Sequence, residues 1–236
     1  MLVTLFKGLL IVLLAIPLSV LALLSVPIDR SGKLFHLVAR TWSRFILWIF
    51  GIKVKVRGLE HLEPNRHYVY VSNHASMFDI PALITGIPDN VRLVLKKELT
   101  KVPLWGWALR YGHYIVIDRG KARDAMRSLE RAAERMRTGA SVILFAEGTR
   151  TRTGKLQAFK RGAFSLAVRS GVPIVPVTIN NTFGILPKGS IDVRPADIEM
   201  VLEKPVPTAT VEGREAETRL MTEVRAAIEK HYVEQA

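Results

Sequence analysis

The sequence predicts an α/β domain with a mixed central sheet flanked by helices, preceded by an N-terminal membrane-associated helical hairpin or two-helix motif. Short β-rich runs alternate with helical stretches after Gly51, and such alternation builds a sheet that helices cover. A chain of 236 residues suffices for one domain of this kind and a short appendage. We therefore divide the chain into N-terminal membrane-anchoring helices, residues 1–52, and one α/β domain, residues 53–236.

An apolar segment without charge, residues 8–26, predicts that the N-terminus enters a membrane. The segment reaches the length of roughly 20 apolar residues that crosses a bilayer. The apolar region of a cleaved signal peptide has only about 7 to 15 residues and precedes a small-residue cleavage site, which is not evident around Ser25 and Val26. Pro17 removes a backbone hydrogen bond in the middle of the segment, which allows a kink or a re-entrant hairpin.

Residues 33–52 are expected to form a second helix, at the membrane interface. His36, Arg40 and Arg44 recur at four-residue spacing and form a basic stripe. Five large aromatic residues occupy the remainder of the segment: Phe35, Trp42, Phe45, Trp48 and Phe50. This mixture is typical of a helix that lies in the headgroup region. The alternative is a core helix of a soluble domain.

The net charge of +13 indicates an anionic partner. Residues 92–169 contain 18 lysines and arginines against 6 acidic residues, a balance of +12. Phosphate headgroups, a phosphorylated substrate or nucleic acid would suit this charge, but no nucleic-acid recognition motif accompanies it. Part of the charge belongs to an amphipathic helix expected at residues 122–137, whose arginines recur every four residues.

Cysteine is absent, which excludes disulfides, thiolate metal sites and a cysteine nucleophile. The six histidines form no His-Glu-x-x-His pattern. We therefore expect a reaction that needs no metal.

Six runs are expected to form strands of the main sheet: residues 54–56, 68–72, 91–95, 114–117, 142–146 and 174–179. Residues 191–194 and 198–202 lie so close together that we expect a tight antiparallel pair. Residues 214–234 are expected to form a closing helix.

His74 and Asp79 follow directly on the strand expected at residues 68–72. Polar groups at the end of a strand commonly line a site. On one straight helix the two side chains would point about 140° apart, because successive residues turn by about 100°. If His74 lies in the turn before a helix and Asp79 in its first turns, the carboxylate can orient the imidazole as a general base. Asp79 would otherwise serve only to favour the start of a helix.

A second polar cluster, residues 145–155, follows the strand expected at residues 142–146. Its two arginines, Arg150 and Arg152, and its loop amides suit a phosphate. Gly148 and Gly154 are one residue too far apart for a nucleotide phosphate loop, and Leu156 follows Lys155 where that loop has Ser or Thr. We therefore exclude an ATP site.

Two further pieces complete a set of four: Ile117-Asp118-Arg119 and the Val-Pro-Ile-Val-Pro-Val run at residues 172–177. Together with Asn73-His74-x4-Asp79 and the Glu-Gly-Thr-Arg block at residues 147–150, they resemble the glycerolipid acyltransferase family, especially the 1-acyl-sn-glycerol-3-phosphate (lysophosphatidic acid) acyltransferases. The resemblance extends from about Gly51 to about Val177, and the combination of the four motifs is highly specific.

The resemblance implies a glycerol-3-phosphate acyltransferase-like fold and a role for each motif. His74 would be the catalytic base and Asp79 its orienting partner. The phosphate of the acceptor would be bound by Arg119, Glu147, Gly148, Thr149 and Arg150, with Arg152 assisting and Lys96 beside the site. For Glu147, an anchoring role within the loop, through a nearby arginine, is an equal alternative.

The implied reaction transfers a fatty acyl group from acyl-CoA or acyl carrier protein to the sn-2 hydroxyl of 1-acyl-glycerol 3-phosphate, giving phosphatidic acid for phospholipid synthesis. The implied partners are lysophosphatidic acid, the acyl-CoA or acyl carrier protein co-substrate, and membrane lipid, without nucleic acid and without a cofactor. We expect the protein on the cytoplasmic (inner) membrane, with its active site facing the cytoplasm.

Other functions stay open at this point. The acceptor could be glycerol 3-phosphate, another lysophospholipid or a lyso-aminolipid, and a non-catalytic protein that binds anionic lipid would carry the same basic surface. Ser72 and Ser76 flank His74 and could be acylated in a serine hydrolase, but the Gly-x-Ser-x-Gly elbow of such enzymes is missing.

Overall fold

The computed structural model describes residues 2–118, 128, 133, 140–208 and 213–235. Its centre is a seven-stranded sheet in the order β1-β7-β6-β2-β5-β3-β4. The strands are β1 (Val54–Arg57), β2 (Val69–Ser72), β3 (Val91–Lys96), β4 (Ile115–Ile117), β5 (Ser141–Phe145), β6 (Ile174–Asn180) and β7 (Ile198–Leu202). Strands β6 and β7 are antiparallel and the other neighbouring pairs are parallel, so the predicted mixed sheet is confirmed.

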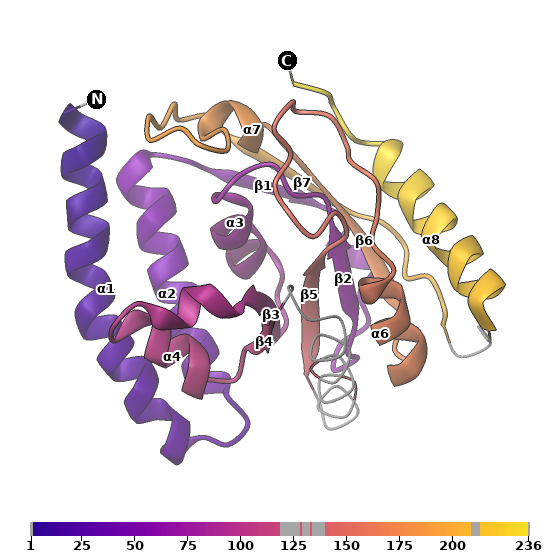
Figure 1. Ribbon diagram of the computed structural model, residues 1–236, viewed down its shortest axis with the longest axis horizontal. Helices are drawn as coiled ribbons and strands as arrows, with labels where there is room; N and C mark the ends of the chain where they lie inside the picture. Colours follow the sequence, from indigo (N-terminus) through magenta and orange to yellow (C-terminus); the bar gives the residue numbers. More distant parts are fainter. Residues whose placement is uncertain (1, 119–127, 129–132, 134–139, 209–212, 236) are drawn as a thin grey trace.

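Helices cover both faces of the sheet (Figure 1). On one side lie α1 (Leu2–Ile28), α2 (Lys33–Phe50), α3 (Asp79–Gly86) and α4 (Trp105–Tyr111), and on the other lie α6 (Gly162–Ser170) and α8 (Gly213–Glu229). Three short helices complete the described elements: η1 (Leu59–His61), η2 (Lys97–Lys101) and α7 (Thr182–Ile185). The predicted architecture, a sheet between two helical layers, is therefore present.

The central strand β2 is buried on both faces, and its side chains alternate between two apolar clusters. Tyr70 packs into the cluster shared with α2, α3 and α4, whereas Val69 and Val71 pack into the cluster under α6 and α8. This alternation is the two-residue period of a strand, and burial on both faces explains why Val69, Tyr70 and Val71 follow one another without a charged residue. Strand β2 thereby lies rigidly between β5 and β6.

The carboxyl ends of β2, β5 and β6 meet at one edge of the sheet. Ser72 is in register with Phe145 of β5 and with Val177 of β6. Because the three strands are parallel, the segments that follow them leave the sheet side by side. The two predicted polar clusters, after β2 and after β5, are therefore neighbours in space.

The expected two-helix motif at the N-terminus is a hairpin of α1 and α2 (Figure 1). The carboxylate of Asp29 closes the turn by accepting hydrogen bonds from the amide and hydroxyl of Ser31 and from the amide of Leu34. Helix α1 continues through Pro17, so no re-entrant hairpin forms within it. Among the described residues it is the one helix long and apolar enough to cross a membrane, and many of its large apolar side chains are exposed.

The basic stripe expected on α2 is only partly exposed. Arg40 donates hydrogen bonds to two backbone carbonyls at the C-terminal end of α3, and His36 is buried. Arg44, Phe45 and Trp48 do face outward. The expected stripe of His36, Arg40 and Arg44 is therefore exposed only at Arg44, because α2 packs one side on α3.

Two other expected elements differ in the structure, and a third lies mostly outside the described residues. Residues 191–194 form no strand, and β7 is inserted instead between β1 and β6, where it has two partners rather than one. Helix α8 ends at Glu229, five residues before the expected end, because the chain after it turns to contact the loops beyond β5 and β6. The helix expected at residues 122–137 lies outside the described residues, except for Ser128 and Ala133.

Candidate active site

His74 and Asp79 come together where β2 ends. His74 lies in the irregular segment after the strand, and Asp79 is the first residue of α3. Nδ1 of His74 is 2.7 Å from Oδ2 of Asp79, as the sequence predicted. The same oxygen accepts hydrogen bonds from the amides of Ala75 and Ser76, at 2.7 and 2.9 Å. The carboxylate is thereby fixed, and it holds the tautomer in which Nδ1 carries the hydrogen and Nε2 is the basic nitrogen.

The imidazole of His74 is also held from the side. It stacks on the ring of Phe145, the last residue of β5, with 3.7 Å between ring centroids and 12° between the planes. The preceding residue, Asn73, accepts a hydrogen bond from the amide of Ile179 and donates one to its carbonyl, both at 2.8 Å. These contacts fix the segment to β5 and β6, and only 12% of the His74 side chain is exposed. Such a base is oriented before a substrate arrives.

Glu147 joins the segment after β2 to the loop after β5. Its side chain is buried, and Oε1 accepts a hydrogen bond from the amide of His74 at 2.7 Å. Oε2 accepts hydrogen bonds from the amide and the side chain of Gln157, at 3.0 and 2.8 Å. The partners are two amides and a glutamine side chain rather than the arginine that the sequence suggested. This carboxylate is thus placed to anchor the loop beside the base.

The loop that follows, residues 148–155, lies against the backbone of His74. Gly148 has a φ of 69°, the left-handed conformation that glycine adopts without strain, and the side chain of Lys160 lies beside it. The amide of Thr151 donates a hydrogen bond to the carbonyl of His74 at 2.9 Å. Thr149 is exposed and Arg150 is half-buried, so both are accessible next to the base.

Lys188, which sequence reasoning missed, contacts the same loop. Its Nζ is 2.9 Å from Oγ1 of Thr149 and 3.4 Å from the carbonyl oxygen of Arg150. Both partners are neutral oxygens, so Lys188 brings a positive charge to the loop that carries Arg150. The residue lies beyond Val177, where the resemblance ends, and a lysine between a proline and a glycine carries no signal of its own.

The remaining predicted residues lie farther out. Lys96 ends β3 on the same edge of the sheet; it is exposed, and its Nζ is 3.2 Å from a carboxylate oxygen of Glu98. Arg152 is exposed on the loop. Arg119 lies outside the described residues. The described part of the chain thus gathers the predicted residues of the first and second motifs, with Lys96 at the rim.

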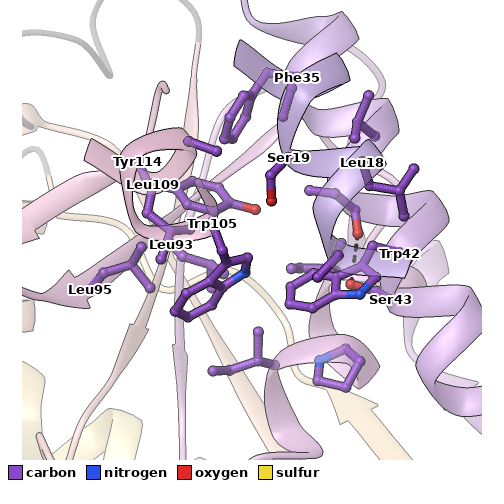
Figure 2. Close-up of a pocket in the computed structure, with 18 of the residues that line it drawn as sticks. Leu18, Ser19, Phe35, Trp42, Ser43, Leu93, Leu95, Trp105, Leu109 and Tyr114 are labelled. Carbon is purple, nitrogen blue, oxygen red and sulfur yellow. Dashed lines mark hydrogen bonds between the residues drawn. The ribbon is translucent and has the colours of Figure 1, made fainter. Parts of the chain in front are cut away.

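Two apolar spaces lie beside the turn and the first part of α3 that follow the base. A cavity of about 110 Å³ lies between α1, α2, α3, α4 and β3, with Trp42 and Trp105 facing each other across it (Figure 2). A more open groove of about 630 Å³ runs between the N-terminal half of α1, α2 and residues 186–193. Met77 and Pro81 line both spaces, so both reach the residues on either side of Asp79.

The fold and this site can be compared with known proteins. A family model described as Acyltransferase matches residues 53–180. The chain is 35% identical over 181 residues to the chloroplastic 1-acyl-sn-glycerol-3-phosphate acyltransferase BAT2 of Brassica napus, which covers 75% of this chain and 52% of the relative. It is 34% identical over 181 residues to the 1-acyl-sn-glycerol-3-phosphate acyltransferase of Pseudomonas aeruginosa, over 75% and 69% of the two chains.

A solved structure is also similar. The crystal structure of the 1-acyl-sn-glycerophosphate acyltransferase PlsC from Thermotoga maritima matches with a TM-score of 0.82 and 26% identity, over 100% of this chain and 97% of the other. The matched regions span about half the length of the first two plant relatives, 52% and 49%. Because the family model covers more than half of the chain, the protein belongs to the Acyltransferase family, which confirms the resemblance.

Proposed function

We propose that this protein transfers a fatty acyl group from acyl-CoA or acyl carrier protein to the sn-2 hydroxyl of 1-acyl-glycerol 3-phosphate, forming phosphatidic acid. The observation that carries the proposal is that one buried carboxylate, Glu147, ties the Asp79-oriented base His74 to a loop bearing Arg150. A base and a cationic anchor are thereby held together. The names of the relatives from Brassica napus and Pseudomonas aeruginosa support the same reaction.

In the proposed mechanism, Nε2 of His74 takes the proton of the acceptor hydroxyl as its oxygen attacks the thioester carbonyl. The tetrahedral intermediate then collapses, the carbon–sulfur bond breaks, and the imidazolium returns the proton to the leaving thiolate. A base positioned in this way contributes roughly 10²- to 10⁴-fold to a rate. Asp79 stabilises the imidazolium through its contact with Nδ1.

The phosphate of the acceptor would bind at the loop after β5. Arg150 and Lys188 would supply two positive charges, and Thr149, whose hydroxyl contacts Lys188, would supply a hydroxyl. Bonds from cationic donors to phosphate are short and roughly twice as strong as neutral ones. Arg152, exposed on the same loop, and Lys96, at the rim, would assist. Glu147, whose oxygens are already occupied by three hydrogen bonds, would act through the loop instead.

The two apolar spaces fit the two hydrocarbon chains that the reaction brings together. The smaller cavity beside α3 would receive the first part of the transferred chain, whereas the more open groove along α1 would receive the chain of the acceptor. Both chains would then approach His74 from Met77, three residues after it. Exposed apolar side chains on α1 support contact of this groove with a bilayer, from which a lysolipid could enter.

Membrane association is therefore part of the proposal, with α1 inserted and the site at the cytoplasmic face of the inner membrane. Removing residues 1–52 should release the protein from membranes or impair turnover of a membrane-embedded acceptor. An active and fully soluble truncated protein would count against this arrangement.

The decisive experiment measures transfer of a labelled acyl group from acyl-CoA, and separately from acyl carrier protein, to lysophosphatidic acid. Purified wild type is compared with a folded His74→Ala variant. We expect wild type to form phosphatidic acid and the variant to form none above background. Product with other lysophospholipids or lyso-aminolipids, but not with lysophosphatidic acid, would reassign the acceptor, and no product with any acceptor would refute the enzymatic function.

A further inference from the structure

The chain after α8 crosses the molecule to the loop that bears Arg150. We call residues 231–235 the C-terminal strap. The strap lies along the end of β6, where the side chain of Asn180 donates a hydrogen bond to the carbonyl of His231 at 2.7 Å and accepts one from the amide of Val233 at 3.0 Å. Asn180 is buried, so this pairing is part of the interior rather than an incidental surface contact. The strap therefore has a defined course up to Val233.

Its last described residue is fixed as well. The side chain of Gln235 accepts a hydrogen bond from the amide of Gly184 at 3.1 Å and donates one to Oδ1 of Asn181 at 2.8 Å. Asn181 lies between β6 and α7, and Gly184 belongs to α7, so both partners follow the strand that anchors Asn73. The strap is thus held by the last residue of β6 at its start and by the segment after β6 at its end.

Within the strap, Tyr232 also contacts the loop after β5. The hydroxyl of Tyr232 donates a hydrogen bond to the carbonyl of Gly154 at 2.6 Å. Gly154 is buried with a φ of 71°, and a Cβ atom on it would lie 1.6 Å from the carbonyl oxygen of Gln235. Two backbones can approach so closely only because Gly154 has no side chain. Lys155 adds a peripheral ion pair with Glu234, at 3.9 Å.

Tyr232 also lies near the carboxylates of the candidate active site. Burial raises the pKa of its hydroxyl to about 12, and the negative charges of Glu147 and Asp79 add to the rise. Its phenol therefore lies within electrostatic reach of both carboxylates of the site while its oxygen bonds to the loop. The loop is fixed at its start by Glu147 and at its end by Tyr232, with Arg150 between them.

We propose that Tyr232 is a positioning residue, which acts through Gly154 to hold the loop of residues 148–155 in the shape that binds the acceptor's phosphate. The inference rests on the proposed function, because it assigns the loop to that phosphate. Tyr232 itself touches no reacting atom. Its loss should weaken binding of the acceptor and leave both the chemical step and the binding of the acyl donor unchanged.

The test compares Tyr232→Phe, which removes one hydroxyl, with Thr178→Val as a matched control. The hydroxyl of Thr178 is buried and donates a hydrogen bond to the carbonyl of Ile228 at 3.0 Å, so its loss removes one buried hydrogen bond between β6 and α8 and leaves the bond of Tyr232 to Gly154 in place. For Tyr232→Phe we expect the KM for lysophosphatidic acid to rise about three- to tenfold, the range set by loss of one hydrogen bond. The kcat and the KM for acyl-CoA should stay within about twofold, and Thr178→Val should show no rise in KM at a similar fall in Tm.

A second variant and a second readout make the result decisive. Gly154→Ala should raise the same KM, and adding Tyr232→Phe to it should raise it no further, because the strap is already displaced. Amide hydrogen exchange should be faster at residues 148–155 in Tyr232→Phe than in wild type or Thr178→Val. An unchanged acceptor KM, a fall in kcat alone, or equal exchange in all three proteins would overturn the proposal. If wild type does not acylate lysophosphatidic acid, the proposed function fails, whereas the exchange measurement still tests whether the strap holds the loop.

Discussion

Nδ1 of His74 and Oδ2 of Asp79 lie 2.7 Å apart, and the same oxygen of Asp79 accepts hydrogen bonds from the backbone amides of the two residues that follow His74. The carboxylate therefore fixes the base and the turn that carries it at once. Because one charged oxygen makes all of these contacts, a substitution that keeps the shape of Asp79 but removes its charge should impair the base.

Asp79→Asn should lower kcat by about 10²- to 10⁴-fold, the range that a correctly held base contributes. The amide is neutral, so it no longer stabilises the imidazolium that forms when His74 takes the proton. Steady-state kinetics with saturating donor and acceptor measure the effect, and circular dichroism verifies the fold. A variant that retains more than about a tenth of the wild-type kcat would show that Asp79 does not orient the base.

Lys188→Met should raise the KM for lysophosphatidic acid by about tenfold or more, because a charge-assisted hydrogen bond contributes about 1.5 to 3 kcal/mol. The exposed Lys204→Met serves as the control for loss of one positive charge far from the loop. The sharpest comparison uses monoacylglycerol, an acceptor without phosphate. Lys188→Met should leave turnover of that acceptor unchanged, and an equal loss with both acceptors would remove Lys188 from phosphate binding.

Ala108→Leu should shift the preference of the enzyme towards shorter acyl donors. Ala108 is buried on α4 and lines the cavity of about 110 Å³, so three added carbon atoms take up a substantial part of that space. Overpacking costs about 1 to 3 kcal/mol, so the ratio of kcat/KM for long over short chains should fall by about tenfold. A series of acyl-CoA substrates measures the ratio, with Ala226→Leu on the exposed side of α8 as control. An unchanged chain-length profile would place the transferred chain elsewhere.

Two glycine substitutions should separate backbone strain from steric exclusion. Gly58 and Gly171 both have left-handed φ angles, 86° and 68°, but a Cβ on Gly58 would lie 1.9 Å from the carbonyl oxygen of Leu202, whereas one on Gly171 would meet nothing within 4 Å. Gly171→Ala should lower the free energy of unfolding by about 1 kcal/mol through strain alone. Gly58→Ala should lower it by at least about 2 kcal/mol, because β1 and β7 must also move apart. Urea denaturation measures both, and equal losses would contradict the clash.

Local sequence patterns predicted much of this architecture. The six runs expected as strands correspond to β1 to β6. For β2 and β6, burial on both faces leaves a mostly apolar run that can be read directly. The contact of His74 with Asp79 was also predictable, since both residues belong to one strand-end turn and their spacing excludes a shared helical face. The catalytic and phosphate-binding roles of these residues stay predictions until the variants are assayed.

The sequence by itself therefore determined the order of the elements, the apolar N-terminal helix and the position of both polar loops. Only the tertiary structure decided that β7 lies between β1 and β6, that Lys188 joins Arg150, and that Tyr232 reaches Gly154. The physical reason is range. Periodicity and strand-end chemistry are properties of neighbouring residues. The contact of Lys188 with Arg150 joins residues 38 apart, and that of Tyr232 with Gly154 joins residues 78 apart, so both depend on how the whole sheet packs.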